Sequence, residues 1–208
     1  MPAIDAIEHR LRVHQPLLMP RDHRTPTAVA LILRASPAGP EILFIERASH
    51  EGDPWSGNLG FPGGKVERRD RDARQTAERE TLEEIGVDLA GTRFLGRLSD
   101  IAGAHLPVLI SCFVYCLDDP AIFKPSGEVS SIFWVPLGLI FNPGHHQTTR
   151  VSFAGKIIDT PAILIPEQPN TPLWGITYRL VMQFLAILGH DPSKTSSNRS
   201  LAASSPEK

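Results

Sequence analysis

The sequence predicts a mixed α/β (α+β) domain, with helices packed against a largely antiparallel or mixed β-sheet. Three observations predict this fold class. Short β-rich runs recur along the chain, a strongly charged helix follows a glycine-rich loop, and a heavily apolar helix comes last. With 208 residues, of which 41% are hydrophobic, the chain is long enough to bury a core of its own.

The first segment, residues 1–25, predicts an N-terminal helical extension. Ile4, Ile7 and Leu11 recur at helical spacing, which indicates a short amphipathic helix. Charged residues interrupt this segment, so it does not resemble a secretion signal.

The strands are predicted from runs of β-branched and aromatic residues bounded by turn residues. The expected strands are residues 27–34, 41–47, 93–98, 109–117, 129–135, 150–158 and 161–165. The turn-rich sequence ASPAGP joins the first two into a hairpin, and the last two resemble a second hairpin. Residues 48–62 are polar and glycine-rich without periodicity, which indicates an ordered loop.

Three helices follow the extension in the predicted order. Residues 71–85 form a charged helix that ends at Gly86, a residue suited to a helix C-cap. Residues 136–141 form a short helix, and the apolar segment 177–188 forms the last. The main domain is therefore residues 26–190, and residues 191–208 are too polar to fold and predict a disordered tail.

Charge and cysteine content exclude several classes of protein. The formal net charge is −2 with both signs interspersed, which argues against binding nucleic acid through the overall field. No stretch is long and apolar enough to cross a membrane. Cys112 and Cys116 lie on one face of a predicted strand, which favours two buried thiols over a disulfide or a metal site. Such thiols suggest a cytoplasmic location.

Three carboxylates share one face of the charged helix. Glu80, Glu83 and Glu84 have the spacing of neighbours on a helix surface, where like charges repel. A solvated acidic face is the simple interpretation. Hard oxygen ligands gathered at one point are also what Mg²⁺ or Mn²⁺ prefers.

The glycine-rich loop before the helix favours the metal site. Gly63 and Gly64 allow a backbone path that is closed to other residues, so peptide groups can approach a cation or a phosphate. The loop, the helix and the carboxylates together indicate a cation and phosphate site far more specifically than any one of them alone.

The stretch from Gly60 to Val87 resembles the Nudix box, G-x5-E-x7-R-E-U-x-E-E-x-G-U. The second half matches at its polar positions, which are Arg79, Glu80, Glu83, Glu84 and Gly86, and Thr81 occupies an aliphatic position. A strict alignment places Arg71 at the first glutamate. Aligning Gly64 with the leading glycine places Asp70 there instead, with one inserted residue before Arg79.

The resemblance implies an α/β/α sandwich with a mixed central sheet, a Nudix loop–helix and a C-terminal helix. It also implies Mg²⁺-dependent (or Mn²⁺-dependent) hydrolysis of a diphosphate linkage. The expected metal ligands are Glu80, Glu83 and Glu84 with the Gly64 carbonyl and, by the shifted alignment, Asp70. The expected catalytic residues are Glu80, Glu83, Glu84, Arg79 and Glu128, with Glu80 and Glu128 as alternative general bases. The expected substrate contacts are Arg47, Phe61, Gly63 and Gly64.

Simpler roles stay open for several of these residues. Glu128 and Arg47 are equally well interpreted as solvated residues at strand ends, and Phe61 is better interpreted as part of the core. His105 and the pair His145-His146 are expected in polar loops rather than at a metal.

Further similarities point to the branch of the family that contains coenzyme A diphosphatases. In that branch an arginine and a small residue precede a glycine shortly before FPGG, and Arg47-Ala48 and Gly57 supply these. The loop SHEGDPWS lacks the basic residue typical of the branch, and Asn58 stands where relatives carry histidine. Coenzyme A or its thioesters are therefore one expected substrate class, and ADP-ribose, NADH or a dinucleoside polyphosphate another. An inactive nucleotide-binding module is the third alternative.

The expected partner is a small-molecule nucleotide diphosphate, and a homodimer stays open. No nucleic-acid partner and no membrane association are expected. In particular, the basic stripe of an RNA-binding track is missing from the sequence.

Overall fold

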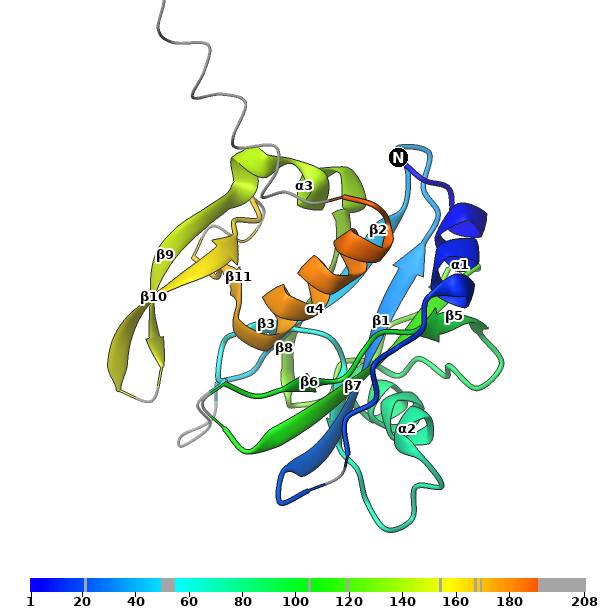
Figure 1. Ribbon diagram of the computed structural model, residues 1–208, viewed down its shortest axis with the longest axis horizontal. Coiled ribbons are helices and arrows are strands. Elements are labelled where there is room, and N and C mark those ends of the chain that lie inside the picture. Colours follow the sequence, from blue (N-terminus) through cyan, green and yellow to red (C-terminus); the bar gives the residue numbers. More distant parts are fainter. Residues whose placement is uncertain are drawn as a thin grey trace, which may run out of the picture.

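Figure 1 shows the computed structural model of the chain. It describes residues 1–20, 22–49, 55–104, 106–118, 120–153, 155–166, 168 and 170–190. The predicted tail at 191–208 and the loop position of His105 lie outside these residues.

Along the described chain, runs of strands are separated by helices. In order they are α1 (Ile4–Val13), β1 (Thr25–Arg34), β2 (Glu41–Arg47), β3 (Leu59–Gly60), β4 (Gly63–Lys65), α2 (Ala73–Ile85), β5 (Arg93–Arg97), β6 (Ile101–Ala102), β7 (Val108–Leu117), β8 (Val129–Pro136), α3 (Leu137–Phe141), η1 (Pro143–His145), β9 (His146–Phe153), β10 (Lys156–Ile163), β11 (Leu173–Trp174) and α4 (Gly175–Ile187).

The main sheet is mixed and has eight strands. Its central path runs β3-β2-β1-β7-β5, while β4 pairs with β1, β6 with β7 and β8 with β2. β1 and β7 are parallel along their whole length, and the other pairs are antiparallel. A second sheet, β11-β10-β9, forms an arm that projects from the body in Figure 1.

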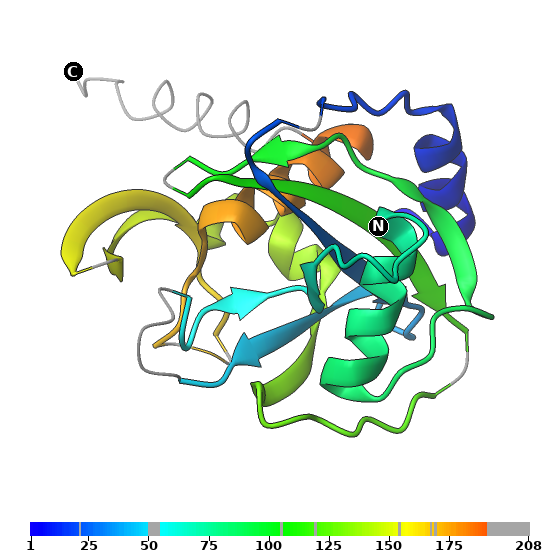
Figure 2. The same cartoon turned by 90° about the horizontal axis from the view of Figure 1, so that it is seen from below.

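Helices cover both faces of the main sheet, so the fold is an α/β/α sandwich. Alternate residues of β1 point to opposite faces, as the pleat of a strand requires. Ala30 and Ile32 pack with α2 on one face, and Leu31 and Leu33 pack with α1, α3 and α4 on the other. Figure 2 shows α2 and α4 on either side of the sheet.

The N-terminal extension packs onto the domain. Ile7 and Leu11 of α1 are buried in the core on the α4 side. Arg93 on β5 forms ion pairs with Asp5 and Glu8 of the same helix.

The structure corrects the predicted hairpins in two details. β1 and β2 pair directly at only two positions, Leu33↔Ile42 and Arg34↔Glu41, after which they diverge and pair with β4 and β3. The second hairpin turns at Gly155, where φ is +73°, rather than at residues 159–160. Glycine adopts this left-handed conformation without a steric penalty, so it sets the turn and the register of β9 and β10.

Both cysteines are free and buried, as predicted. Cys112 and Cys116 lie on the α4 side of β7, and burial raises the pKa of Cys112 to about 12 and that of Cys116 to about 11. In the described part of the chain, no helix combines the length and apolar character needed to cross a bilayer.

Candidate active site

Strand β4 brings the two glycines into contact with both β1 and α2. Gly63 has φ +155°, and a Cβ there would lie 2.3 Å from the carbonyl oxygen of Ala28. A Cβ on Gly64 would lie 2.3 Å from Cδ of Glu80. Because no real side chain tolerates such distances, glycine at 64 lets the Glu80 carboxylate approach the backbone.

The α2 helix is anchored at both ends, which fixes the direction of its carboxylates. Asp72 is the N-cap, and its side chain accepts a hydrogen bond from the Gln75 amide at 2.8 Å. Gly86 ends the helix with φ +73°. The small, buried side chain of Thr81 donates to the Ala77 carbonyl and lets the helix lie close to the sheet.

Glu84 is a buried carboxylate that faces the glycine strand. Its side chain is 5% exposed, and Oε2 accepts a hydrogen bond of 2.8 Å from the Gly63 amide. Arg47 Nη1 lies 3.8 Å from Oε1. Burial raises the pKa of Glu84 to about 7, against the lowering effect of the Gly63 amide and Arg47. Burial therefore disfavours the charged form of Glu84, and the Gly63 amide and Arg47 offset only part of this effect.

Glu80 and Glu128 are two further carboxylates that act on this site. Burial raises the pKa of Glu80, and the hydrogen bond from Arg79 opposes that effect. The charge of Glu128 raises the pKa of both Glu80 and Glu84. Glu128 itself is exposed at the start of β8. A carboxylate from outside the helix therefore acts on both Glu80 and Glu84.

Glu83 is more exposed than Glu80 and Glu84, and two arginines bind its carboxylate. Its oxygens lie 2.9 Å from Arg79 Nη1 and 3.1 Å from Arg69 Nη2, and the side chain is 49% exposed. Over the described residues, no three acidic, histidine or cysteine side chains meet closely enough to hold an ion. Arg79 Nη1 also donates to Glu80 at 2.9 Å, so the Glu80 and Glu83 carboxylates share one donor, while Arg69 holds the other oxygen of Glu83 at the surface.

Asp70, the metal ligand expected by the shifted alignment, is bonded to Arg79 and Thr76. Arg79 donates to both of its oxygens, from Nε at 2.9 Å and from Nη2 at 3.0 Å, and Thr76 donates at 2.8 Å. The side chain is only 2% exposed. These bonds, led by the one from Arg79, hold the pKa of Asp70 far below its usual range. Asp70 therefore fixes Arg79, which in turn donates to Glu80 at 2.9 Å.

The expected substrate contacts lie in two environments. Arg47 ends β2 at a β-bulge and reaches the buried Glu84, so it borders the carboxylates. Phe61 is 6% exposed and stacks on Phe44, with ring centroids 5.2 Å apart. The structure thus places Phe61 in the core rather than at a substrate surface.

Sequence reasoning missed two contacts near the site. Arg69, in the loop between β4 and α2, reaches Glu83, and nothing in its spacing distinguishes it from its arginine neighbours. The indole of Trp174 donates to Oδ1 of Asn58 at 3.1 Å, which joins the start of α4 to the loop before β3. The unusual asparagine at 58 was the available signal for this second contact. His146 Nε2 lies 2.8 Å from the Ile140 carbonyl oxygen, which agrees with a structural role.

The residues present fit a divalent cation. Glu80 and Glu84 supply hard oxygen donors beside a strand whose glycine at 64 leaves no Cβ in the way. Burial and neighbouring carboxylates raise the pKa of both groups. A cation beside them would lower the free-energy cost of keeping both carboxylates charged.

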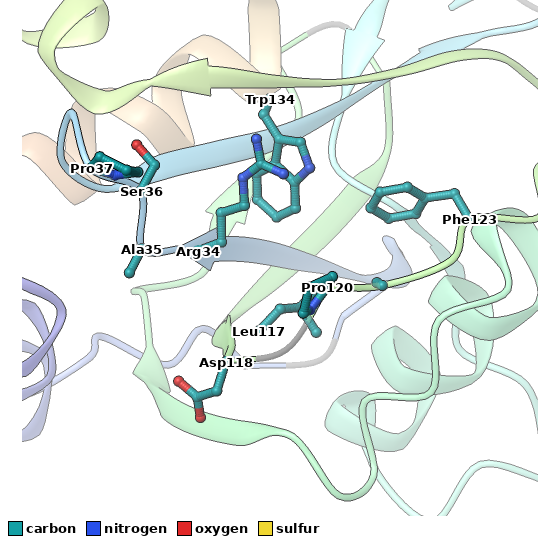
Figure 3. A pocket seen from close by; sticks show the side chains of 10 residues that line it. Arg34, Ala35, Ser36, Pro37, Leu117, Asp118, Pro120, Phe123 and Trp134 are labelled. Atoms are coloured by element: carbon teal, nitrogen blue, oxygen red, sulfur yellow. The ribbon is translucent and has the colours of Figure 1, made fainter.

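A separate cavity of about 350 Å³ lies where β1 and β7 end and near the end of β8 (Figure 3). Its lining includes Arg34, Leu117, Phe123 and Trp134, and the Arg34 guanidinium lies 4.3 Å from the Trp134 ring centroid. No carboxylate of α2 lines this cavity. It is therefore not part of the candidate active site.

Comparisons with known proteins agree with this architecture. The model of the NUDIX domain family matches residues 23–155. The peroxisomal coenzyme A diphosphatase ndx-8 of Caenorhabditis elegans is 41% identical over 141 residues, which cover 66% of this chain and 58% of that protein. The human mitochondrial coenzyme A diphosphatase NUDT8 is 29% identical over 159 residues, which cover 74% and 66%.

A solved structure supports the fold alone. The MutT/nudix family protein from Enterococcus faecalis superimposes with a TM-score of 0.54 at 16% identity, over 90% of this chain and 75% of that one. The curated relatives are longer than the matched region. An uncharacterized protein of Schizosaccharomyces pombe is 37% identical over 112 residues, and this match covers 50% of this chain and 34% of that protein.

These relatives contradict the predicted cytoplasmic location. The two coenzyme A diphosphatases are named as peroxisomal and mitochondrial proteins. The prediction rested on two reduced thiols, and buried thiols do not distinguish the cytoplasm from another reducing compartment.

Proposed function

Because the chain belongs to the NUDIX domain family, we propose that it is a pyrophosphohydrolase that requires a divalent cation, Mg²⁺ or Mn²⁺. Its proposed substrate is coenzyme A or a coenzyme A thioester, which it cleaves to 4′-phosphopantetheine (or its acylated form) and 3′,5′-ADP. One observation carries the hydrolase assignment: the buried Glu84 carboxylate bonded to the Gly63 amide, with Glu80 packed on Gly64.

The substrate class rests on sequence and on the relatives. Arg47-Ala48 and Gly57 precede FPGG as they do in coenzyme A diphosphatases, and two of the compared relatives carry that name. Asn58 and the loop at 49–56 depart from that pattern. The departures make the substrate the part of the proposal that most needs a direct test.

Different side chains have different roles in the proposed reaction. Glu80 and Glu84, with the Gly64 carbonyl, would hold the cation, and Glu83 would be a further ligand. The cation supplies charge neutralisation and Lewis acidity for the diphosphate when it is bound. Arg47, beside Glu84, binds a phosphate oxygen through its guanidinium.

The attacking water needs a group that accepts its proton. Glu128 is proposed for this role because it is exposed and yet close enough for its charge to act on Glu80 and Glu84. Glu80 is the alternative, and Arg79 donates a hydrogen bond of 2.9 Å to its Oε1.

A substrate panel tests the proposal. The full chain is incubated with Mg²⁺ or Mn²⁺ and with coenzyme A, acetyl-coenzyme A, ADP-ribose, NADH or a dinucleoside polyphosphate, and products are identified by mass. Release of 4′-phosphopantetheine and 3′,5′-ADP from coenzyme A, lost on adding chelator, supports it. Rapid cleavage of ADP-ribose with coenzyme A untouched would overturn the substrate class. Binding without turnover of any compound would indicate a nucleotide-binding module.

A further inference from the structure

Two arginines hold Glu83, and they differ in how firmly each one is fixed. Arg79 lies 2.9 Å from Glu83 Oε2, and its own side chain is 13% exposed. Its two bonds to the buried Asp70 do not involve Glu83 at all. Arg79 therefore stays in place whether or not Glu83 moves.

Arg69 is held only at the surface. Its Nη2 lies 3.1 Å from Glu83 Oε1, and its Nε lies 2.8 Å from Glu67 Oε2. The Arg69 side chain is 60% exposed, and those of Glu67 and Glu83 are each 49% exposed. Ion pairs this exposed are weak, because water competes for both charges. A stronger partner can therefore displace Arg69 from Glu83.

We infer that Arg69 is an exchangeable counter-ion: it holds Glu83 while no cation is bound, and it turns to the substrate's diphosphate once the cation has taken Glu83. The inference rests on the proposed function, in which Glu83 is a cation ligand. A cation beside Glu80 and Glu84 attracts Glu83 and repels the guanidinium of Arg69.

Once Glu83 has moved to the cation, the diphosphate supplies a new negatively charged partner for Arg69. It binds at the cation, on the side of the helix where Arg69 already lies within hydrogen-bonding distance of Glu83. Guanidinium groups bind phosphate oxygens in pairs, with charge-assisted hydrogen bonds stronger than those to a half-exposed carboxylate. Arg69 is thus a positioning residue for the substrate, and it competes with the cation when substrate is absent.

Arg68 provides a matched control. It is the adjacent residue, it carries the same charge and it is exposed. Within the described residues, the structure gives Arg68 no hydrogen bond or ion pair. The variants Arg69→Ala and Arg68→Ala have the same net charge, so a difference between them reports the contact with Glu83 and not the general field.

The test measures cation binding before any chemistry. Free Mn²⁺ is followed by electron paramagnetic resonance during titration of the wild type, Arg69→Ala and Arg68→Ala at low ionic strength. Arg69→Ala is expected to bind Mn²⁺ about twofold to fivefold more tightly than Arg68→Ala, because one competitor for Glu83 is gone. At saturating Mn²⁺, its affinity for α,β-methylene-ADP is expected to fall about fivefold or more below that of Arg68→Ala.

The outcomes separate this inference from the proposed function. Equal Mn²⁺ affinities for the two variants overturn the inference, and so does an equal affinity for α,β-methylene-ADP; in either case the hydrolase proposal stands. Absence of Mn²⁺ binding by the wild type, even with α,β-methylene-ADP present, overturns the inference and the proposed function together.

Discussion

Replacing Asp70 with asparagine should destabilise the protein more than any exposed ion pair does. Asp70 is 2% exposed and accepts two hydrogen bonds from Arg79, which is itself 13% exposed. Removing one partner of a buried pair costs about 3–5 kcal/mol in general. The asparagine side chain would keep one acceptor oxygen, and Arg79 would keep Glu80 and Glu83. We therefore expect Asp70→Asn to lower the free energy of unfolding by about 2–3 kcal/mol.

Urea unfolding at pH 7 with a chelator present measures this loss, and Asp159→Asn is the matched control. Asp159 pairs with Arg150 at 3.3 Å, but these side chains are 65% and 81% exposed, so its loss should cost about 0.5 kcal/mol or less. The pKa of Asp70 is depressed in the folded state. Its stabilisation is therefore complete above the unfolded pKa of about 4 and is lost as the pH falls below that value. Equal unfolding midpoints for Asp70→Asn and Asp159→Asn at pH 7 would refute the anchoring role.

Three further predictions concern the carboxylates. Glu84→Gln should lower turnover at least about 100-fold, because a cation ligand is lost. The metal-free protein should be no less stable, because Gln still accepts a hydrogen bond from the Gly63 amide and one buried charge is removed. Near-full activity would contradict the role of Glu84 as a cation ligand. Glu128→Gln should lower kcat about 100-fold to 10,000-fold with Mn²⁺ affinity kept, and an unchanged kcat would transfer the base role to Glu80. Gly64→Ala should weaken Mn²⁺ binding about tenfold or more, since its Cβ meets the Glu80 carboxylate, whereas Gly91→Ala, with open space around it, should not.

The helix of the site was predictable because its signals are local. Gly86 predicted its end, whereas the predicted start at residue 71 lies two residues before Ala73, because Asp72 is the N-cap. Helical spacing puts Glu80 and Glu84 on one face of the helix. That face lies against Gly63 and Gly64, which leave room for the two carboxylates. The position of Glu128 came from family resemblance, since pairing between β2 and β8 is not visible in sequence.

The remaining features depend on contacts between distant residues. The contact of Glu83 with Arg69 joins residues fourteen apart along the chain, and Arg69 lies on a loop whose course no periodicity predicts. Phe61 was ambiguous because a lone aromatic near a glycine-rich strand has the same sequence signature in a core as in a binding site. The turn of the second hairpin lies at Gly155 and not between residues 158 and 161, and Pro161 lies within β10, paired with Thr148.

The position of the cation is the most direct test of the account. A crystal of the full chain grown with Mn²⁺ and α,β-methylene-ADP would show that ion in an anomalous difference map. The account predicts a peak coordinated by Glu80, Glu84 and the Gly64 carbonyl, with Glu83 turned toward it and the diphosphate bound to the same ion. A map with no peak there, or with the only strong peak away from α2, would contradict it.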